Sequence, residues 1–167
     1  PEADGASDVM RCALGVREIA RLAPLRIEPD ELLIGSATLV QAVHHNVPVY
    51  AGGKVAFAGT SHTTIGFDKA LRVGYAGLAA EIGARLAAGG LDDRGRDFLH
   101  ALRVCIEAAG IWQGRYLDEL DRRIAAATPE QAEHYSRVRG NLAAVGDRRP
   151  RTFRQAVQAL WLYFAFQ

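Results

Sequence analysis

The chain has 167 residues, of which 49% are hydrophobic and 23% are charged, and its formal net charge is +1 at pH 7. This length is typical of one domain, and the composition excludes collagen-like, low-complexity and charge-driven disordered proteins. Lys and Arg together number 20 against 19 Asp and Glu, so no excess charge is available for binding nucleic acid by electrostatics.

The cysteines and the amino terminus indicate the compartment. Cys12 and Cys105 are too few for a disulfide scaffold and lack the C-x-x-C spacing of a zinc site, so we interpret them as two buried apolar thiols in a reducing environment. The acidic start of the chain has no apolar signal region, and no apolar run approaches the ~20 residues of a membrane span. The sequence therefore predicts a cytoplasmic protein with no membrane partner.

The first predicted helix begins near Ser7 and ends before Pro24. Ser7 is a suitable N-cap, and an apolar stripe at helical spacing follows it, formed by Val9, Ala13, Val16 and Ala20. Proline cannot continue the helix, because it lacks a backbone N–H.

Two further helices are predicted on either side of Gly89-Gly90. The earlier one carries a single continuous stripe and ends at these glycines, which readily take the left-handed conformation of a C-terminal cap; its stripe consists of Leu71, Tyr75, Leu78, Ile82 and Leu86. The later one is capped by Asp92 or Asp93 and is long, since its stripe includes Phe98, Leu102, Ile106, Ala109, Trp112, Tyr116, Leu120 and Ile124.

Two capping-box patterns predict the last two helices. Thr128 and Gln131 enclose Pro129 at the first helical position, and an inner face of Tyr135, Val138, Leu142 and Val145 leads to Gly146. Thr152 and Gln155 open the second helix, which runs to the end of the sequence. No linker divides the chain, so we predict a mainly α class with a single helical domain over residues 1–167.

Residues 27–65 form the exception, because they carry no helical stripe. Residues 31–35 are expected to be a short extended piece, and residues 54–58 alternate weakly and are expected to pair with it. A loop of this length in a compact domain is usually functional or held by its surroundings. Here we expect the surroundings to be missing, so that the chain is a fragment of a larger protein.

The last predicted helix supports the same expectation. Residues 160–166 are apolar on every side, and such a helix is normally buried on every side. A small helical body can cover one face of it, so we expect the rest of the protein or another protomer to cover its aromatic rings, namely Trp161, Tyr163, Phe164 and Phe166.

Several motifs share features with sites of chemistry, but none of them meets the requirements of one. Gly52-Gly53-Lys54 fails as a phosphate-binding loop, since Pro48 and Val55 occupy positions that need Gly and Ser or Thr. The histidines of the irregular segment, His44, His45 and His62, lack metal-ligand spacing and leave a small-ligand site as an open, weaker alternative. The basic cluster Arg148, Arg149, Arg151 and Arg154 is interpreted as a solvated linker or as Arg–carboxylate pairs, with anion binding as the alternative. We therefore predict no catalytic, cofactor-binding or metal-binding residue.

Four stretches carry distinctive patterns that together resemble a known family. They are residues 27–36 (Ile-Glu-Pro-Asp-Glu-Leu-Leu-Ile-Gly-Ser), 61–77, 98–116 and 150–161 (Pro-Arg-Thr-Phe-Arg-Gln-Ala-Val-Gln-Ala-Leu-Trp). In this order they resemble the amino-terminal region of glycyl radical enzymes, the pyruvate formate-lyase-like family. Two departures are Ser61, where the family often has Gly before His, and Gln155-Ala156-Val157 in place of Glu-Ala-Leu.

The resemblance implies a large enzyme built on a ten-stranded α/β barrel, with this chain as the helical layer that precedes the barrel. It also implies a glycyl radical, installed by a radical S-adenosylmethionine activating enzyme, and a cysteine thiyl radical that abstracts hydrogen from the substrate. The family includes formate acetyltransferases, diol and glycerol dehydratases, choline lyase and aryl decarboxylases, and it suggests an anaerobic setting.

Neither radical residue is assigned to this chain. Arg72-Val73-Gly74-Tyr75 is similar to the glycyl radical motif, but it lacks the small residue between Val and Gly and is predicted to lie within a helix. Cys105 lies in a helical stripe without the flanking glycine of the thiyl-radical loop. The leading hypothesis is thus the inactive amino-terminal segment of a glycyl radical enzyme, and the alternative is a stand-alone interaction module that uses the apolar helix at Trp161–Phe166.

Overall fold

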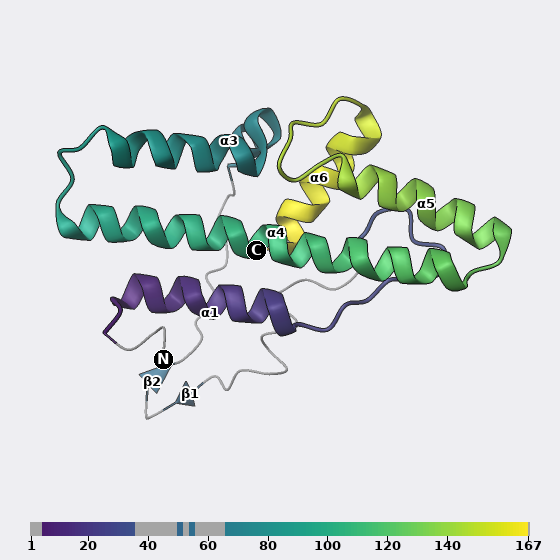
Figure 1. Ribbon diagram of the computed structural model, residues 1–167, viewed down its shortest axis with the longest axis horizontal. Helices are drawn as coiled ribbons and strands as arrows, with labels where there is room; N and C mark the ends of the chain where they lie inside the picture. The colour runs from purple at the N-terminus through teal and green to yellow at the C-terminus, as the bar shows by residue number, and fades with distance from the viewer. Residues whose placement is uncertain (1–4, 36–49, 52–53, 56–65, 167) are drawn as a thin grey trace.

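The computed structural model describes residues 5–35, 50–51, 54–55 and 66–166. Over these residues the chain forms five helices and one short hairpin, which confirms the predicted mainly α class (Figure 1). The elements in chain order are α1 (Asp8–Leu22), β1 (Tyr50–Ala51), β2 (Lys54–Val55), α3 (Phe67–Ala87), α4 (Asp93–Ala126), α5 (Pro129–Ala143) and α6 (Phe153–Phe166).

Helix α4 is the longest helix described, and α1, α3 and α5 pack along it. Helix α1 runs parallel to its first half, where Ser7 hydrogen-bonds to Asp97 and the Arg115 guanidinium donates to the Ala20 carbonyl oxygen at 2.8 Å. Helices α3 and α5 each form a hairpin with α4, α3 along its first half and α5 along its second half (Figure 1). Helices α1, α3 and α5 thus share one layer with α4, because each of them packs one face against it.

Local capping sets where three of the helices begin, as the sequence predicts. The Ser7 hydroxyl accepts from the Met10 backbone N–H, and the Asp92 carboxylate accepts from the Gly95 N–H at 2.7 Å. Thr128 and Gln131 form the complete capping box. The second predicted box differs in one bond: Thr152 Oγ1 accepts from the Gln155 N–H at 3.2 Å, but Gln155 Oε1 accepts from the backbone N–H of Arg151.

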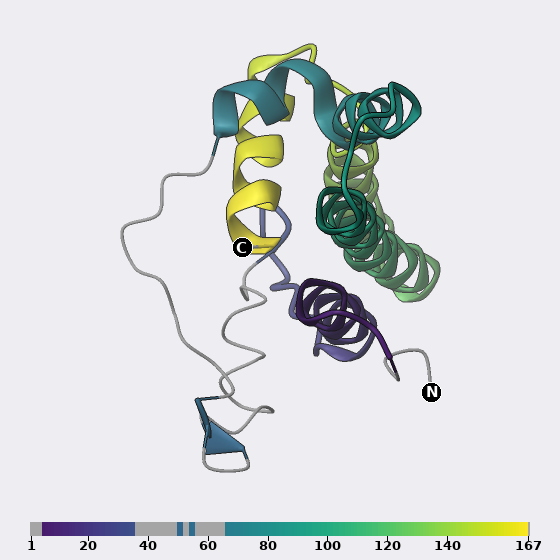
Figure 2. The ribbon, with the colours of Figure 1, turned by 90° about the vertical axis from the view of Figure 1, so that its left-hand side faces the viewer.

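Helix α3 is broken, whereas the sequence pattern predicted one continuous helix. Gly74 has φ 66° and ψ 179°, a conformation that only glycine adopts readily. The short segment before Gly74 therefore points in a different direction from the rest of α3 (Figure 2). The apolar stripe did not reveal this break, because its cause is a contact with residues far along the chain.

The irregular segment also differs from the prediction. Lys54 pairs with Ala51 and Val55 with Tyr50 in an antiparallel hairpin, so residues 54–55 do not pair with residues 31–35 as expected. Residues 31–35 contact α6 instead, where the backbone of Ile34 is hydrogen-bonded by a side chain. The segments considered above for a ligand or a phosphate, at His44, His45, His62 and Gly52-Gly53, lie outside the described residues.

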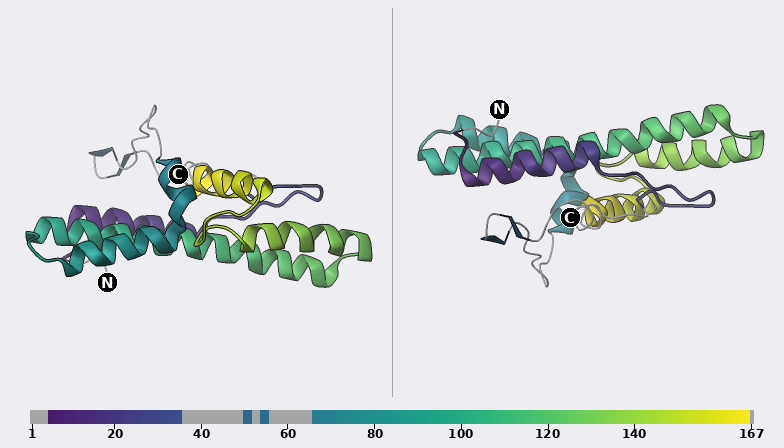
Figure 3. Two further views of the ribbon diagram at one scale, coloured as in Figure 1. Left: turned by 90° about the horizontal axis from the view of Figure 1, so that it is seen from above. Right: turned by 90° about the horizontal axis from the view of Figure 1, so that it is seen from below.

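Helix α6 and the first turns of α3 form a second layer on one face of the layer that contains α4 (Figures 2 and 3). The core lies between the two layers and is centred on α4, whose Trp112 ring lies 5.2 Å from Tyr116 and 5.9 Å from Phe166. The predicted stripe of α4 is confirmed from Ala109 to Leu120, but its first member, Phe98, is 49% exposed. The start of α4 therefore extends beyond the second layer.

Candidate functional site

Five features of the described residues are candidates for a function: a joint between helices, a glutamine that holds residues 31–35, an apolar groove, the outer side of α6, and a basic cluster. Within the described residues, no group of three or more His, Cys, Asp or Glu side chains is placed to hold a metal ion. None of the helices in the described ranges combines the length and the apolar character that a membrane crossing requires.

The joint forms where the break in α3 meets the turn after α5. The backbone N–H groups of Tyr75 and Ala76 donate to the carbonyl oxygens of Gly146 and Asp147 at 2.8 and 3.3 Å. The approach is so close that a Cβ on Gly74 would lie 2.3 Å from the Asp147 oxygen. The second part of α3 therefore begins on acceptors that the loop supplies, and glycine is required at the contact.

A second glycine and a buried amide complete the joint. Gly146 has φ 90°, and a Cβ there would lie 2.2 Å from Gln113 Oε1. The Gln113 side chain donates to the carbonyl oxygens of Leu142 and Val145, both at 2.9 Å. This amide satisfies the last carbonyls of α5 and fixes the direction in which the chain leaves it.

Tyr163 of α6 packs against the same joint. Its hydroxyl lies 3.3 Å from the carbonyl oxygens of Ala70 and Gly146, and its ring lies 5.0 Å from that of Tyr75 in an edge-to-face arrangement. Burial, with a smaller contribution from the charge of Asp147, raises the pKa of Tyr163 to about 12. Burial likewise raises the pKa of Tyr75. Both rings therefore stay neutral and structural at ordinary pH.

A glutamine amide in α6 holds the irregular segment. Gln158 is fully buried, and its side chain accepts from the Ile34 N–H at 3.0 Å and donates to the Ile34 carbonyl oxygen at 3.1 Å. The Trp161 indole N–H donates to the Gly35 carbonyl oxygen at 2.9 Å. The amide thus supplies the two hydrogen bonds that a neighbouring strand would otherwise give to Ile34. A polar residue amid the apolar sequence of α6 was the signal for this site.

An apolar groove of about 370 Å³ lies between α3 and α4, with Phe166 among its lining residues. Its walls include Leu78, Ile82 and Cys105, and Lys69 and Glu81, which also line it, form an ion pair at 2.5 Å. Burial raises the pKa of Cys105, and the nearby Cys12 thiol makes a smaller contribution in the same direction. A thiol that stays protonated is a poor nucleophile, which fits the apolar role that the sequence predicts for Cys105. The prediction of a buried thiol is wrong for Cys12, which is exposed because Ala13 and Ala20 form the buried face of α1.

The outer side of α6 is only partly covered. Tyr163 is buried by this chain's own residues, which corrects the expectation that other parts of the protein must cover it. Phe166 is half-buried beside Trp112, and Trp161 is half-buried. Leu160 and Phe164 are 41% and 46% exposed, and Phe164 packs its ring against Trp161. Among the described residues, the face of α6 that stays exposed beyond its first turn is therefore formed by Leu160, Phe164 and the outer part of Trp161.

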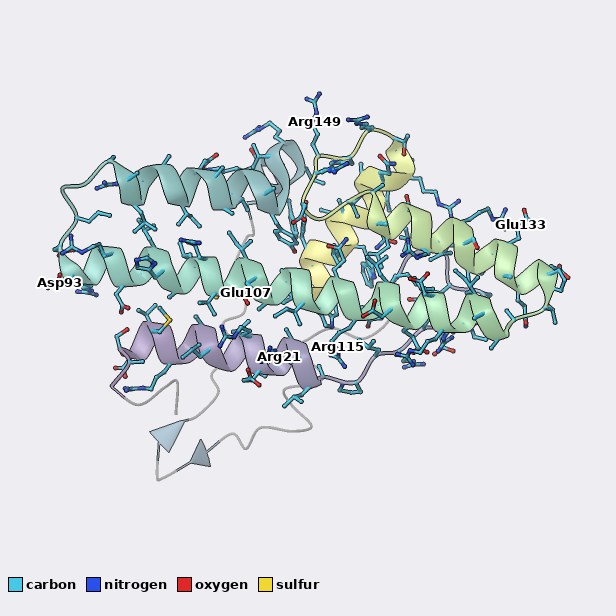
Figure 4. All side chains as sticks on the ribbon, viewed as in Figure 1. Arg21, Asp93, Glu107, Arg115, Glu133 and Arg149 are labelled. Carbon is cyan, nitrogen blue, oxygen red and sulfur yellow. The ribbon has the colours of Figure 1, made fainter. Side chains whose placement is uncertain are left out.

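The predicted basic cluster lies in the loop before α6 and in its first turn. Arg148, Arg149, Arg151 and Arg154 are all exposed, and none of them forms an ion pair within the described part of the chain. Arg149 points away from the body of the protein (Figure 4). The predicted Arg–carboxylate pairs are therefore not formed by these four side chains.

Comparisons with known proteins place the fold. The family described as pyruvate formate lyase-like matches residues 40–166. The structure is similar to the glycerol-bound form of the B12-independent glycerol dehydratase from Clostridium butyricum, with a TM-score of 0.81 and 17% sequence identity. The match covers 99% of this chain and 30% of that chain. No match was found among curated proteins.

Proposed function

Because the chain belongs to the pyruvate formate lyase-like family, we propose that it is the amino-terminal helical layer of a glycyl radical enzyme and is inactive by itself. The observation that carries this proposal is the family match over residues 40–166. The shared fold supports it, since the chain spans 30% of the length of the similar glycerol dehydratase. The proposed reaction class is radical cleavage of a C–C, C–O or C–N bond, in a cytoplasmic, anaerobic enzyme.

The radical centres of the proposed enzyme lie outside this chain. In the whole enzyme a glycyl radical, installed by a radical S-adenosylmethionine activating enzyme, would supply the thiyl radical that abstracts hydrogen from the substrate. Gly74 and Cys105 do not fit these roles. The tight contact with Asp147 accounts for glycine at position 74, and the raised pKa of Cys105 fits an apolar packing role.

The chain's own contribution to this enzyme is a rigid surface. The joint fixes α3 against the turn after α5, and Tyr163 holds α6 against both. Gln158 fixes residues 31–35 against α6. We infer that the barrel, or another protomer, packs on Leu160, Phe164 and the outer part of Trp161. Covering these side chains removes apolar surface from water, and each Å² of apolar surface buried stabilises the assembly by about 25 cal/mol.

Spectroscopy tests the proposal directly. The purified chain is incubated anaerobically with an activating enzyme and S-adenosylmethionine, beside a complete glycyl radical enzyme treated in the same way. We expect the glycyl radical doublet in the electron paramagnetic resonance spectrum of the complete enzyme and none from this chain. A doublet from this chain would overturn the proposal, and so would a longer reading frame without an R-V-x-G-Y motif near its end.

The exposed side of α6 also fits the second candidate, a stand-alone interaction module. Sedimentation separates the two functions, because each predicts a different state of the free chain. If the chain needs the barrel, the apolar face should make the isolated chain self-associate. A stable monomer at all concentrations would favour the independent module.

A further inference from the structure

Most of the arginines that lack an ion pair or a carbonyl partner within the described residues gather in one place. Elsewhere in the described residues, most arginines form an ion pair or donate to a backbone carbonyl, as Arg96 does with Asp93 and Arg123 with Ile27. The exceptions within those residues are Arg94, Arg103 and Arg137, which are spread over α4 and α5, and the group formed by Arg148, Arg149, Arg151 and Arg154. We call this group, together with Phe153, the basic-aromatic patch.

The patch is unfavourable for the isolated chain. Its arginines repel one another, and the loop from residue 144 to residue 152 contains a single carboxylate, that of Asp147. Arg154 lies in the first turn of α6, where the helix dipole is positive and where no acidic residue is present. Among the described residues, this end of the helix therefore carries positive charge without an acidic residue in its first turn.

An aromatic ring lies among these charges. Phe153 is 86% exposed, more than any other large apolar side chain described. Arginine and aromatic residues are the side chains most enriched at the centre of protein interfaces. The loop is also held firmly, by the Gln113 amide at its start and by the Gln155 side chain at Arg151, so little ordering is needed on binding.

We propose that the basic-aromatic patch is the docking site for an acidic segment of another protein, with an apolar side chain beside its carboxylates to cover Phe153. The planar guanidinium of arginine matches a carboxylate with two parallel hydrogen bonds. A nucleic acid would need a longer basic surface, but the chain has a net charge of +1 and its other basic side chains lie mostly beside carboxylates. The site is separate from the proposed radical chemistry, so either proposal can fail without the other.

A binding assay with defined probes tests the proposal. The probe is a short fluorescein-labelled peptide in which glutamates flank a phenylalanine and a leucine, and fluorescence anisotropy measures its affinity for the full chain. The test variant is R149E/R154E. The matched control is R94E/R137E, which makes the same change of charge at unpaired arginines outside the patch. All four side chains are exposed, and thermal unfolding checks that both variants fold.

We expect R149E/R154E to weaken peptide binding by about tenfold or more, because each substitution removes an attraction and adds a repulsion. The control variant should change the affinity by less than about twofold, and Phe153→Ala should weaken binding without changing its salt dependence. Equal effects of the two double variants, or no binding by the wild-type chain, would overturn the proposal. Tighter binding of a single-stranded oligonucleotide or of phosphatidylserine vesicles through the same arginines would also overturn it.

Discussion

Replacing Gly74 with alanine tests the joint that holds the two layers together. An added Cβ would lie 2.3 Å from the Asp147 carbonyl oxygen and 2.9 Å from the Arg148 backbone nitrogen. Both neighbours are backbone atoms, so the loop must move as a whole. The φ of 66° and ψ of 179° are also strained for any residue with a Cβ, at about 1–3 kcal/mol.

The expected loss of stability follows from these contacts. Moving the loop breaks the hydrogen bonds from Tyr75 and Ala76 to residues 146 and 147, and each contributes about 0.5–1.5 kcal/mol. Together with the strain, Gly74→Ala should lower the free energy of unfolding by about 2–6 kcal/mol. Urea unfolding, followed by the fluorescence of the buried Trp112, measures this change.

Gly83 in the same helix provides the matched control. It lies in the second part of α3, and a Cβ there meets no atom within 4 Å. Gly83→Ala should therefore stabilise the protein by about 0.5–1 kcal/mol, because alanine loses less backbone entropy in a helix. The reasoning is refuted if Gly74→Ala leaves the stability unchanged or raises it as Gly83→Ala does, since the break in α3 would then not exist in solution.

Three other predictions concern a buried amide, a buried tyrosine and the two cysteines. Gln158→Leu leaves the N–H and the carbonyl of Ile34 without their partners, so the free energy of unfolding in urea should fall by about 1–3 kcal/mol for each group. An unchanged midpoint would contradict the role of the amide. The pKa of Tyr163 is raised to about 12, so the free energy of unfolding should fall as pH rises from about 10, where the unfolded tyrosine ionises, to about 12. Tyr163→Phe should flatten this decline, and an equally steep decline in the variant would contradict the prediction. Iodoacetamide should alkylate the exposed Cys12 well before Cys105, since burial raises the Cys105 pKa; mass spectrometry of timed samples measures the order, and equal rates would refute it.

The helix boundaries were predictable because their causes are local. Ser7, Asp92 and Thr128 each bond to a backbone N–H within the next three residues, and the glycines at 89 and 90 take the positive φ of a helix end. Such signals depend only on neighbouring residues, so they can be identified without any tertiary structure. The resemblance to the glycyl radical family likewise depends on sequence alone, and the match over residues 40–166 confirms it.

The surfaces were predictable only in part. An apolar sequence shows that α6 has apolar sides, but it does not show which of them this chain covers itself. The structure buries Tyr163 and leaves Phe164 partly exposed, because the joint and the layer that contains α4 meet α6 on one side only. The basic-aromatic patch was visible as a basic cluster, but its lack of counter-charges depends on where every carboxylate lies.

The sequence by itself determined the mainly α class, the caps that start most of the helices, and the family. Only the tertiary structure decided the break at Gly74, the role of Gln158 and the pairing of the short hairpin. The physical reason is that each of these depends on a partner distant in the chain or on strand register. The oxygen that excludes a Cβ at Gly74 belongs to Asp147, and the backbone that Gln158 satisfies belongs to Ile34. No local pattern of apolar residues contains that information.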